Sequence, residues 1–402
     1  MKLLHTADWH IGQLFHGYER KKEHLFFFEW LKRIIRERQA DVLLIAGDIF
    51  DSPNPSAESQ KLYYHFLREL TSENPGLQTV IIAGNHDSAA RLEAPNPLLE
   101  EINISVKGTI KHLSGGGIDF GDLLVPLKKN GEIFAWCMTV PYLRQGDHPD
   151  AETYSKGVSA MYEKIYEELE ENGNELPVIA MGHLQATGSS VSENDRSERT
   201  IIGGLECVAP EAFDKKKIVY TALGHLHKSQ YVSGRENLRY SGSPLPMSFA
   251  EKNYKQGIQL IELSKNGLER IEKIEFDTPV KLLSLPQEPK PLDQVLEVIA
   301  GLPDGEPDDS SPYLELKVLI TGPEPSLRNQ IEDALKNKKV RLASAVPFRI
   351  KAEAHAGTIS YEEMKAIHPL NIAEDVFFNK YGNSMPDNIK LLLQNVIREV
   401  ET

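Results

Sequence analysis

Five short motifs place metal-binding and acid–base side chains directly after apolar runs of the sequence. The motifs are Asp8-Trp9-His10, Gly47-Asp48-Ile49-Phe50-Asp51, Gly84-Asn85-His86-Asp87, Gly182-His183 and Gly224-His225-Leu226-His227. Imidazole, carboxylate and amide ligands without thiolates suit manganese, iron or zinc better than calcium, and the oxygen content favours manganese. Because these ligands are too many for one ion, we expect two ions that share a carboxylate. Such a pair suits phosphate ester hydrolysis.

Each motif also has an ordinary structural explanation when it is taken alone. A Gly-Asp pair after a strand is often a turn before a helix cap, and an Asn-containing turn can precede a surface histidine. A lone histidine is usually structural. Five strand ends that all carry such residues are a rare coincidence, so the motifs together predict a metal cluster.

The apolar run Val42–Ala46 shows no alternation, which predicts a strand that is covered on both faces, as in a parallel sheet flanked by helices. Ligands bind beyond the carboxyl ends of such strands. Residues two apart on an extended backbone point to the same side, so we expect Asp8 and His10 to converge while Trp9 packs inward. The same spacing recurs in His225 and His227.

Helical spacing of apolar residues alternates with these strands. Helices are predicted over about 19–38, 56–70 and 154–171, with strands near 2–6, 79–83, 177–181 and 218–223. The alternation of the strands 2–6, 42–46 and 79–83 with the first two helices predicts parallel pairing in the first sheet. Short β segments between 104 and 143 predict a second, mixed or antiparallel sheet. The segment 184–202 is polar and reads as a long loop over the site.

The length of 402 residues predicts two or three domains. The pattern changes near Thr278 and then predicts a small α+β domain over 278–352, for which a dimerisation or purely structural role is an alternative. Residues 353–402 read as a linker and two amphipathic helices, 372–381 and 387–400. An apolar helix face beyond a linker usually binds a partner or packs back.

Composition limits the class of protein further. Cys137 and Cys207 stand far apart, which argues against a disulfide framework and a thiolate zinc site. The N-terminus has no apolar signal segment and no later run is long enough to span a membrane, so we expect a soluble cytoplasmic protein. The net charge of −14 argues against a chain that binds nucleic acid through its overall electrostatic attraction.

The five motifs, in this order, resemble the calcineurin-like metallophosphoesterase superfamily. Within it, the segments GHLQATG, SERTIIGG, TALGHLH and RYSGSPLPMSF resemble the SbcD family, the nuclease subunits of bacterial SbcCD complexes, and the similarity covers roughly 1–263. The resemblance implies an α/β fold: a two-sheet α/β/β/α sandwich with a small α+β cap domain and C-terminal helices. The implied domains are a nuclease domain over 1–277, a capping domain over 278–352 and a partner-binding segment over 353–402.

The resemblance also implies a role for each motif residue. One metal ion is held by Asp8, His10, Asp48 and His227, and Asp48 bridges to a second ion held by Asn85, His183 and His225. His86 is then an unligated histidine that stabilises the transition state and protonates the leaving 3′ oxygen. Asp51 occupies the position that orients this histidine in many relatives, although some nuclease relatives carry a histidine there.

The implied function is a metal-dependent DNA nuclease with a two-metal site, most simply Mn²⁺. It would act as a double-strand exonuclease and a single-strand or hairpin endonuclease in DNA repair and recombination. The implied partners are DNA, an SbcC-type ABC ATPase bound through the C-terminal helices, and a second copy of the chain in a heterotetramer, without a membrane. Candidate DNA contacts are Arg196, Arg199, Lys215, Lys216, Lys217 and Lys228.

Two other functions are compatible with the motifs. A metallophosphoesterase of nucleotides or phosphoproteins would share the metal site but not the polymeric substrate. A non-catalytic scaffold of the same fold would have no use for an unligated histidine, His86, beside the metals. An assay of DNA against nucleotide monoesters separates the first of these from a nuclease.

Overall fold

The computed structural model describes residues 1–190, 207–320 and 324–349, and beyond them residues 370, 373, 374, 376–378, 385, 386, 389–393 and 397. The chain forms two compact units, 1–348 and 349–402. Most of the predicted linker and C-terminal helices lie outside the described residues, as do much of the predicted loop after His183 and the candidate DNA contacts Arg196 and Arg199. The predicted boundaries after 277 and 352 stay predictions.

The first sheet of the larger unit carries the first three motifs at its strand ends. Its six strands lie in the order β14-β13-β1-β4-β5-β6. They are β14 (Gly267–Glu275), β13 (Gly257–Ser264), β1 (Lys2–Thr6), β4 (Val42–Ala46), β5 (Gln78–Ile82) and β6 (Ile104–Lys107). Strands β1, β4 and β5 pair in parallel, as predicted, and β13 runs antiparallel to β1. The prediction placed the segment from 104 onward in the second sheet, but β6 pairs in parallel with β5 in the first sheet.

The second sheet carries the last two motifs. Its order is β11-β12-β10-β9-β8-β7. The strands are β11 (Gln230–Val232), β12 (Arg235–Tyr240), β10 (Ile218–Gly224), β9 (Val178–His183), β8 (Glu132–Thr139) and β7 (Leu124–Lys129). The central strands β12, β10, β9 and β8 are parallel and the two edge strands are antiparallel, so the prediction of a mixed second sheet is confirmed.

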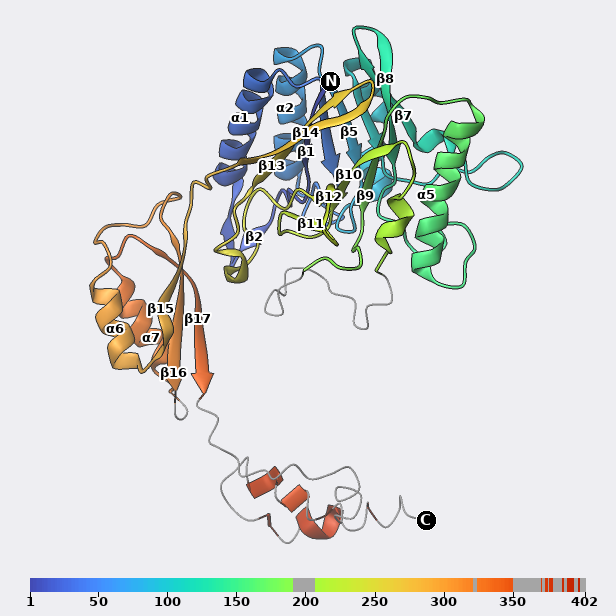
Figure 1. The fold of residues 1–402 in the computed structure, drawn as a ribbon. Coiled ribbons are helices and arrows are strands. Elements are labelled where there is room, and N and C mark those ends of the chain that lie inside the picture. Colours follow the sequence, from blue (N-terminus) through green and yellow to red (C-terminus); the bar gives the residue numbers. More distant parts are fainter. Residues whose placement is uncertain are drawn as a thin grey trace. The chain divides into compact units, whose positions relative to one another are not determined.

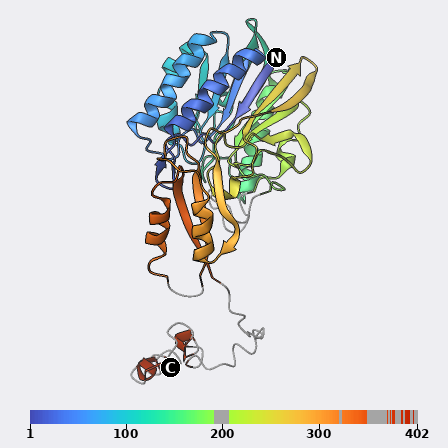
Figure 2. The same cartoon turned by 90° about the vertical axis from the view of Figure 1, so that its left-hand side faces the viewer.

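Helices cover the outer faces of both sheets. Figure 1 and Figure 2 show α1 (Lys21–Arg38) and α2 (Ala57–Glu73) side by side on the first sheet, and Figure 1 shows α5 (Tyr154–Glu171) against the second. Short helices α3 (Ala89–Glu93) and α4 (Asn96–Leu99) precede β6. The layers are therefore α/β/β/α, which confirms the predicted fold class. Within the described residues, no helix has the length and apolar character needed to cross a bilayer.

Burial on both faces explains the unbroken apolar run of β4. Leu43 and Ile45 belong to the core beneath α1 and α2, whereas Val42 and Leu44 belong to the core between the two sheets. Successive side chains of a strand point to opposite faces, so each face needs apolar residues of its own. Apolar burial of this kind stabilises the fold by about 25 cal/mol per Å².

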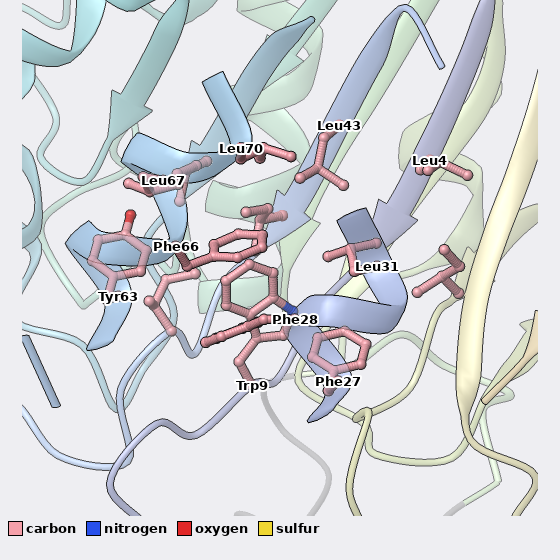
Figure 3. Close-up of a cluster of buried hydrophobic side chains, with 14 of the residues drawn as sticks. Leu4, Trp9, Phe27, Phe28, Leu31, Leu43, Tyr63, Phe66, Leu67 and Leu70 are labelled. Carbon is pink, nitrogen blue, oxygen red and sulfur yellow. The ribbon is translucent and has the colours of Figure 1, made fainter. Parts of the chain in front are cut away.

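An aromatic cluster lies beneath the two helices (Figure 3). The rings of Phe28 on α1 and Phe66 on α2 stack with centroids 4.3 Å apart, and Trp9 lies 5.2 Å from Phe28. Trp9 is fully buried and its Nε1–H donates to Thr6 Oγ1 at 2.9 Å. The predicted inward packing of Trp9 between the two site residues is confirmed.

Residues from 282 onward form a small α+β module inside the larger unit. It consists of β15 (Leu282–Lys290), α6 (Leu292–Ala300), β16 (Tyr313–Ile320), α7 (Leu327–Leu335) and β17 (Arg341–Arg349), with a core of its own. Tyr313 joins it to the sandwich by packing on Phe15 and Phe249 and by donating to Glu23 Oε1 at 2.9 Å. Phe15 lies in a hairpin of β2 (Leu14–Phe15) and β3 (Tyr18–Glu19) that the sequence reading missed.

Candidate metal centre

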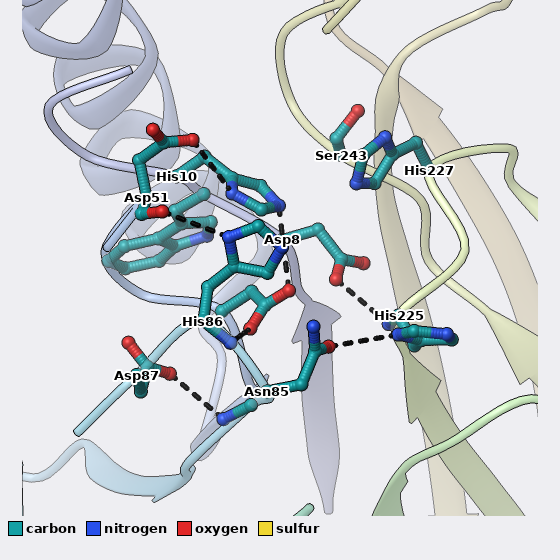
Figure 4. Close-up of polar contacts among 12 residues, drawn as sticks. Asp8, His10, Asp51, Asn85, His86, Asp87, His225, His227 and Ser243 are labelled. Carbon is teal, nitrogen blue, oxygen red and sulfur yellow. Dashed lines mark hydrogen bonds and ion pairs between the residues drawn. The ribbon is translucent and has the colours of Figure 1, made fainter. Parts of the chain in front are cut away.

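The motif residues that follow β1, β4, β5, β9 and β10 meet where the carboxyl ends of the two sheets face each other (Figure 4). The structure brings together Asp8, His10 and His227, then Asp8, Asp48 and His183, and then His10, Asp48 and His86. In each set the ligand atoms lie within 4.8 Å of one another. Five segments that are far apart in the sequence thus supply one polar cluster.

The backbone at the ligands is not extended, and this corrects the sequence reading. Asp8 and His10 follow the end of β1 with φ angles of 55° and 47°, and Asp48 has a φ of 50°. The proposed reason for their convergence, alternation along a strand, is therefore wrong, because the chain turns through left-handed positions instead. Such positions cost non-glycine residues about 1–3 kcal/mol each and persist only where the surroundings enforce them.

The motif glycines permit the close approach of the loops. A Cβ at Gly84 would lie 2.1 Å from Asp48 Oδ1, and one at Gly47 would lie 2.2 Å from His183 Nδ1. Gly47 also has a φ of +88°, a conformation that side chains disfavour. These glycines are part of the site because any side chain there would displace a ligand.

The first ligand group contains buried polar atoms that make no hydrogen bond to the described residues. Asp8 Oδ1 accepts from the His225 main-chain N–H at 2.8 Å, but Asp8 Oδ2 has no hydrogen-bond partner among the described residues. Both ring nitrogens of the buried His10 also make no hydrogen bond to the described residues. His10 Nε2 lies 3.6 Å from Asp48 Oδ2. Buried polar atoms left without partners in a native fold call for a ligand or an ion.

In the second ligand group, side-chain oxygen and nitrogen atoms converge around His183 Nε2. His183 Nδ1 donates to the carbonyl of Ala46 at 2.8 Å, so Nε2 is the ring nitrogen that faces the site. Asn85 Oδ1 lies 3.0 Å from this Nε2 and 3.0 Å from His225 Nδ1, and Asp48 Oδ2 lies 3.3 Å from the same Nε2. A proton on His183 Nε2, or a cation in its place, would stabilise oxygen atoms at these distances.

The electrostatics of the cluster point the same way. Burial alone would lower the pKa of His183. The negative charge of Asp48 outweighs this effect and raises the pKa to about 9. Burial opposes ionisation of Asp48, yet His183 and His10 hold its pKa well below the usual range. Burial and the neighbouring His183 lower the pKa of His225 to about 3. The site therefore attracts positive charge, and a divalent cation would compete with the proton on His183.

His86 lies beside the ligands at a more open position. It is half-buried, its Nδ1 donates to the main-chain oxygen of Asp51 at 2.9 Å, and its ring packs edge-on against His10. The carboxylate of Asp51 instead approaches His10 Nδ1 at 3.3 Å. The contact expected between the Asp51 side chain and His86 is thus made by the Asp51 carbonyl group. The role of Asp51 stays a prediction.

Two further carboxylates support the site. Asp87 is buried and accepts from the main-chain N–H groups of Ile49, Phe50 and Gly84, so it joins the loops after β4 and β5. Glu251, which the sequence reading missed, lies 3.0 Å from His227 Nδ1. No local pattern marks Glu251, because it stands outside the motifs in the segment MSFAEKNY.

The residues fit divalent metal ions. The donor set combines carboxylate, imidazole and amide groups, and its unpartnered buried atoms face one another. The sequence identified every one of these ligand types. What it did not show was which ring nitrogen of each histidine faces the site.

Comparison with known proteins agrees with this geometry. A family model described as calcineurin-like phosphoesterase matches residues 1–229. The SbcD subunit of the SbcCD nuclease of Rhodobacter capsulatus is 38% identical over 85% of this chain and 86% of its own length. The chain belongs to the SbcD family of calcineurin-like phosphoesterases. As a member of that family it is a phosphoester hydrolase.

Other members of the SbcD family match over much of the chain. The Escherichia coli protein is 32% identical over 68% of both chains, and the Bacillus subtilis protein is 29% identical over 80% of this chain and 79% of its own. A second family model, described as the type 5 capsule protein repressor C-terminal domain, matches residues 278–381. This match begins where the sequence predicts a new domain.

Proposed function

We propose that the chain is a metal-dependent DNA nuclease that hydrolyses phosphodiester bonds, as a double-strand exonuclease and as a single-strand or hairpin endonuclease. The observation that carries the proposal is the metal-binding cluster, with half-buried His86 beside it, in a chain similar to nuclease subunits over 85% of its length. A scaffold protein would need neither the ligands nor His86.

We assign the ligands to two divalent cations, with Mn²⁺ as the metal. Asp8, His10, Asp48 and His227 would hold one ion, and Asp48 would be shared with a second ion held by Asn85, His183 and His225. Bound there, the ions would neutralise phosphate charge and lower the pKa of a water molecule that attacks phosphorus. The buried Asp8, His10, Asp48, His183 and His227 form the floor of the site, and half-buried Asn85, His86 and His225 form its open edge.

His86 would supply the proton for the leaving group. Its Nδ1–H is fixed on the Asp51 carbonyl, so the opposite nitrogen, Nε2, is the one that can carry a proton to substrate. Hydrolysis adds hydroxide to phosphorus and a proton to the 3′ oxygen, and an imidazolium at His86 provides that proton. His10 packs against the ring and keeps it beside the metal ligands.

Because the net charge of the chain is negative, DNA binding requires local basic residues or a partner protein. Among the described candidates, Lys215 and Lys217 pair with Glu163 and Glu175, and Lys216 and Lys228 are exposed. Of these last two, Lys228 adjoins the site residue His227 in sequence. We therefore assign the first phosphate contact to Lys228 and further contacts to a partner. Each phosphate contact contributes to a salt-dependent affinity.

The proposed partner is an SbcC-type ABC ATPase, bound through the C-terminal segment, in a heterotetramer with two copies of this chain. Four apolar side chains of that segment are more than half exposed in the described residues: Val376, Phe378, Leu391 and Leu392. Apolar helix faces of this kind bind in grooves between partner helices. In this arrangement the ATPase would carry much of the DNA contact.

The test is nucleotide release from linear duplex DNA by the purified chain with Mn²⁺. A chelator control and a parallel assay on nucleotide monoesters accompany it. We expect Mn²⁺-dependent cleavage of DNA and little monoesterase activity. The reverse pattern would keep the metal site, discard the nuclease proposal and make the chain a phosphoesterase of small substrates.

A further inference from the structure

Glu251 is a buried carboxylate that contacts a metal-ligand candidate from outside the five motifs. Its Oε1 lies 3.0 Å from His227 Nδ1, and both side chains are almost completely inaccessible to solvent. Its Oε2 accepts from the Met247 main-chain N–H at 2.9 Å. A buried carboxylate is costly to desolvate, so its place in a fold calls for partners that use its charge.

The backbone holds this carboxylate in place from both sides. Glu251 ends the short 3₁₀ helix Phe249–Glu251, its N–H donates to Ser248 and its carbonyl accepts from Tyr254. Phe249 anchors the segment by packing on Phe15. The carboxylate therefore has little freedom to follow a movement of His227, and the imidazole must adapt to the carboxylate.

The contact decides which nitrogen of His227 can bind a cation. With Nδ1–H donated to Glu251, the proton is fixed on Nδ1 and the lone pair is on Nε2. A neutral imidazole binds a metal ion through one ring nitrogen while the other carries the proton. A carboxylate that accepts this proton in a hydrogen bond also makes the metal-binding nitrogen more basic. Asp8 and His10 lie within reach of the same His227 ring.

Other ligand histidines have weaker supports of this type. His183 is oriented by the neutral carbonyl of Ala46, and His10 is approached by Asp51, whose side chain is 38% exposed. The Glu251 side chain is 0% exposed. A charge in a dry environment acts more strongly on its neighbour than one that water screens. Glu251 is therefore a stronger orienting group than the neutral Ala46 carbonyl or the partly exposed Asp51 carboxylate.

We propose that Glu251 is a positioning residue that fixes the tautomer of His227 and tunes the affinity of the metal site that contains Asp8 and His10. The inference rests on the metal centre proposed above. It concerns a residue that lies beyond the 1–229 match to the phosphoesterase family model.

The experiment measures Mn²⁺ binding to the full chain by titration calorimetry. It compares the wild type with Glu251→Gln and Glu251→Ala. We expect a loss of affinity of about 10-fold for Glu251→Gln, which keeps an acceptor oxygen, and nearer 100-fold for Glu251→Ala. Nitrogen NMR of histidine-labelled, metal-free protein should show the Nδ1–H form of His227 in the wild type and its loss in Glu251→Ala.

Glu23→Gln is the matched control. Glu23 is the other glutamate that is buried in the described residues, but it pairs with Arg20 and accepts from Tyr313 rather than from a metal-ligand candidate. We expect this control to bind Mn²⁺ like the wild type, although its fold is weakened.

Three outcomes would overturn the inference. Wild-type affinity in Glu251→Gln would remove it while leaving the metal centre in place, and equal losses in Glu251→Gln and Glu23→Gln would reduce Glu251 to a structural residue. A wild-type chain that binds no Mn²⁺ would remove the metal centre and this inference together. If Glu251→Ala does not fold, Glu251→Gln carries the test.

Discussion

Asp87 offers a direct test of how the site is assembled, because one side chain holds two ligand loops together. Its Oδ2 accepts from the N–H groups of Ile49 at 3.1 Å and Gly84 at 2.9 Å, and its Oδ1 accepts from Phe50 at 2.9 Å. The carboxylate is completely buried. Without it, the loop that carries Asp48 loses its tie to the loop that carries Asn85 and His86.

The structure sets the size of the effect. Asp87→Ala leaves three buried N–H groups without an acceptor, and each costs about 1–3 kcal/mol, so we expect a loss of roughly 3–6 kcal/mol after partial relaxation. Asp87→Asn keeps one oxygen, which can still serve Ile49 and Gly84, and leaves only Phe50 unpaired. Its expected cost is about 1–3 kcal/mol. Mn²⁺ affinity should fall about 10- to 100-fold, as for other outer-shell partners.

The assay is urea unfolding of metal-free protein at pH 8, followed by Mn²⁺ titration of the folded variants. Burial and the charge of Asp48 raise the pKa of Asp87 to about 6, so the group is ionised at pH 8. Asp41→Ala is the control, because Asp41 accepts from the Lys2 N–H at the other end of the sheet and should affect stability but not metal affinity. Equal unfolding free energies for Asp87→Ala and Asp87→Asn would refute the reasoning.

Three further predictions follow from the same contacts. His86→Ala should abolish DNA hydrolysis while Mn²⁺ affinity in calorimetry stays within about threefold, and wild-type rates would disprove its role as proton donor. Burial lowers the pKa of His5 to about 3 against an ordinary 6.5, so the unfolded state takes up the proton as the pH falls. The contribution of neutral His5 to the free energy of unfolding is complete above pH 6.5, and about 2 kcal/mol of it is lost by pH 5. In His5→Gln, urea unfolding should find a smaller fall of this free energy with decreasing pH. Deletion of 371–402 should prevent co-purification with an SbcC-type ATPase but preserve Mn²⁺-dependent hydrolysis, and retained binding would exclude this segment as the contact.

Much of the site could be predicted because the motifs are local. Each apolar run predicts one strand, and the motif that follows the run in the sequence must lie at the carboxyl end of that strand. Parallel pairing then brings the ends of β1, β4 and β5 to one edge, which is why the ligand types and their common location followed from the sequence. The helix 154–171 was predicted with the bounds that the structure has.

The predictions failed where the backbone leaves regular geometry. Asp8 and His10 converge through left-handed turns rather than along a strand, and a two-residue spacing cannot distinguish these cases. The hairpin around Phe15 was missed because its strands have only two residues each. Short irregular segments take their conformation from the residues that pack on them, so local propensity carries little information about them.

By itself the sequence determined the chemistry of the ligands and the strands after which they follow, and its resemblance to a known family implied the layers. The tertiary structure decided which atoms meet: the Ala46 carbonyl at His183, 137 residues away, the Asp51 carboxylate at His10 and Glu251 at His227. Hydrophobic periodicity acts over a few residues and is visible in the sequence. The direction of a side chain in a site depends on packing between segments that are distant in sequence, and only the folded chain brings those segments together.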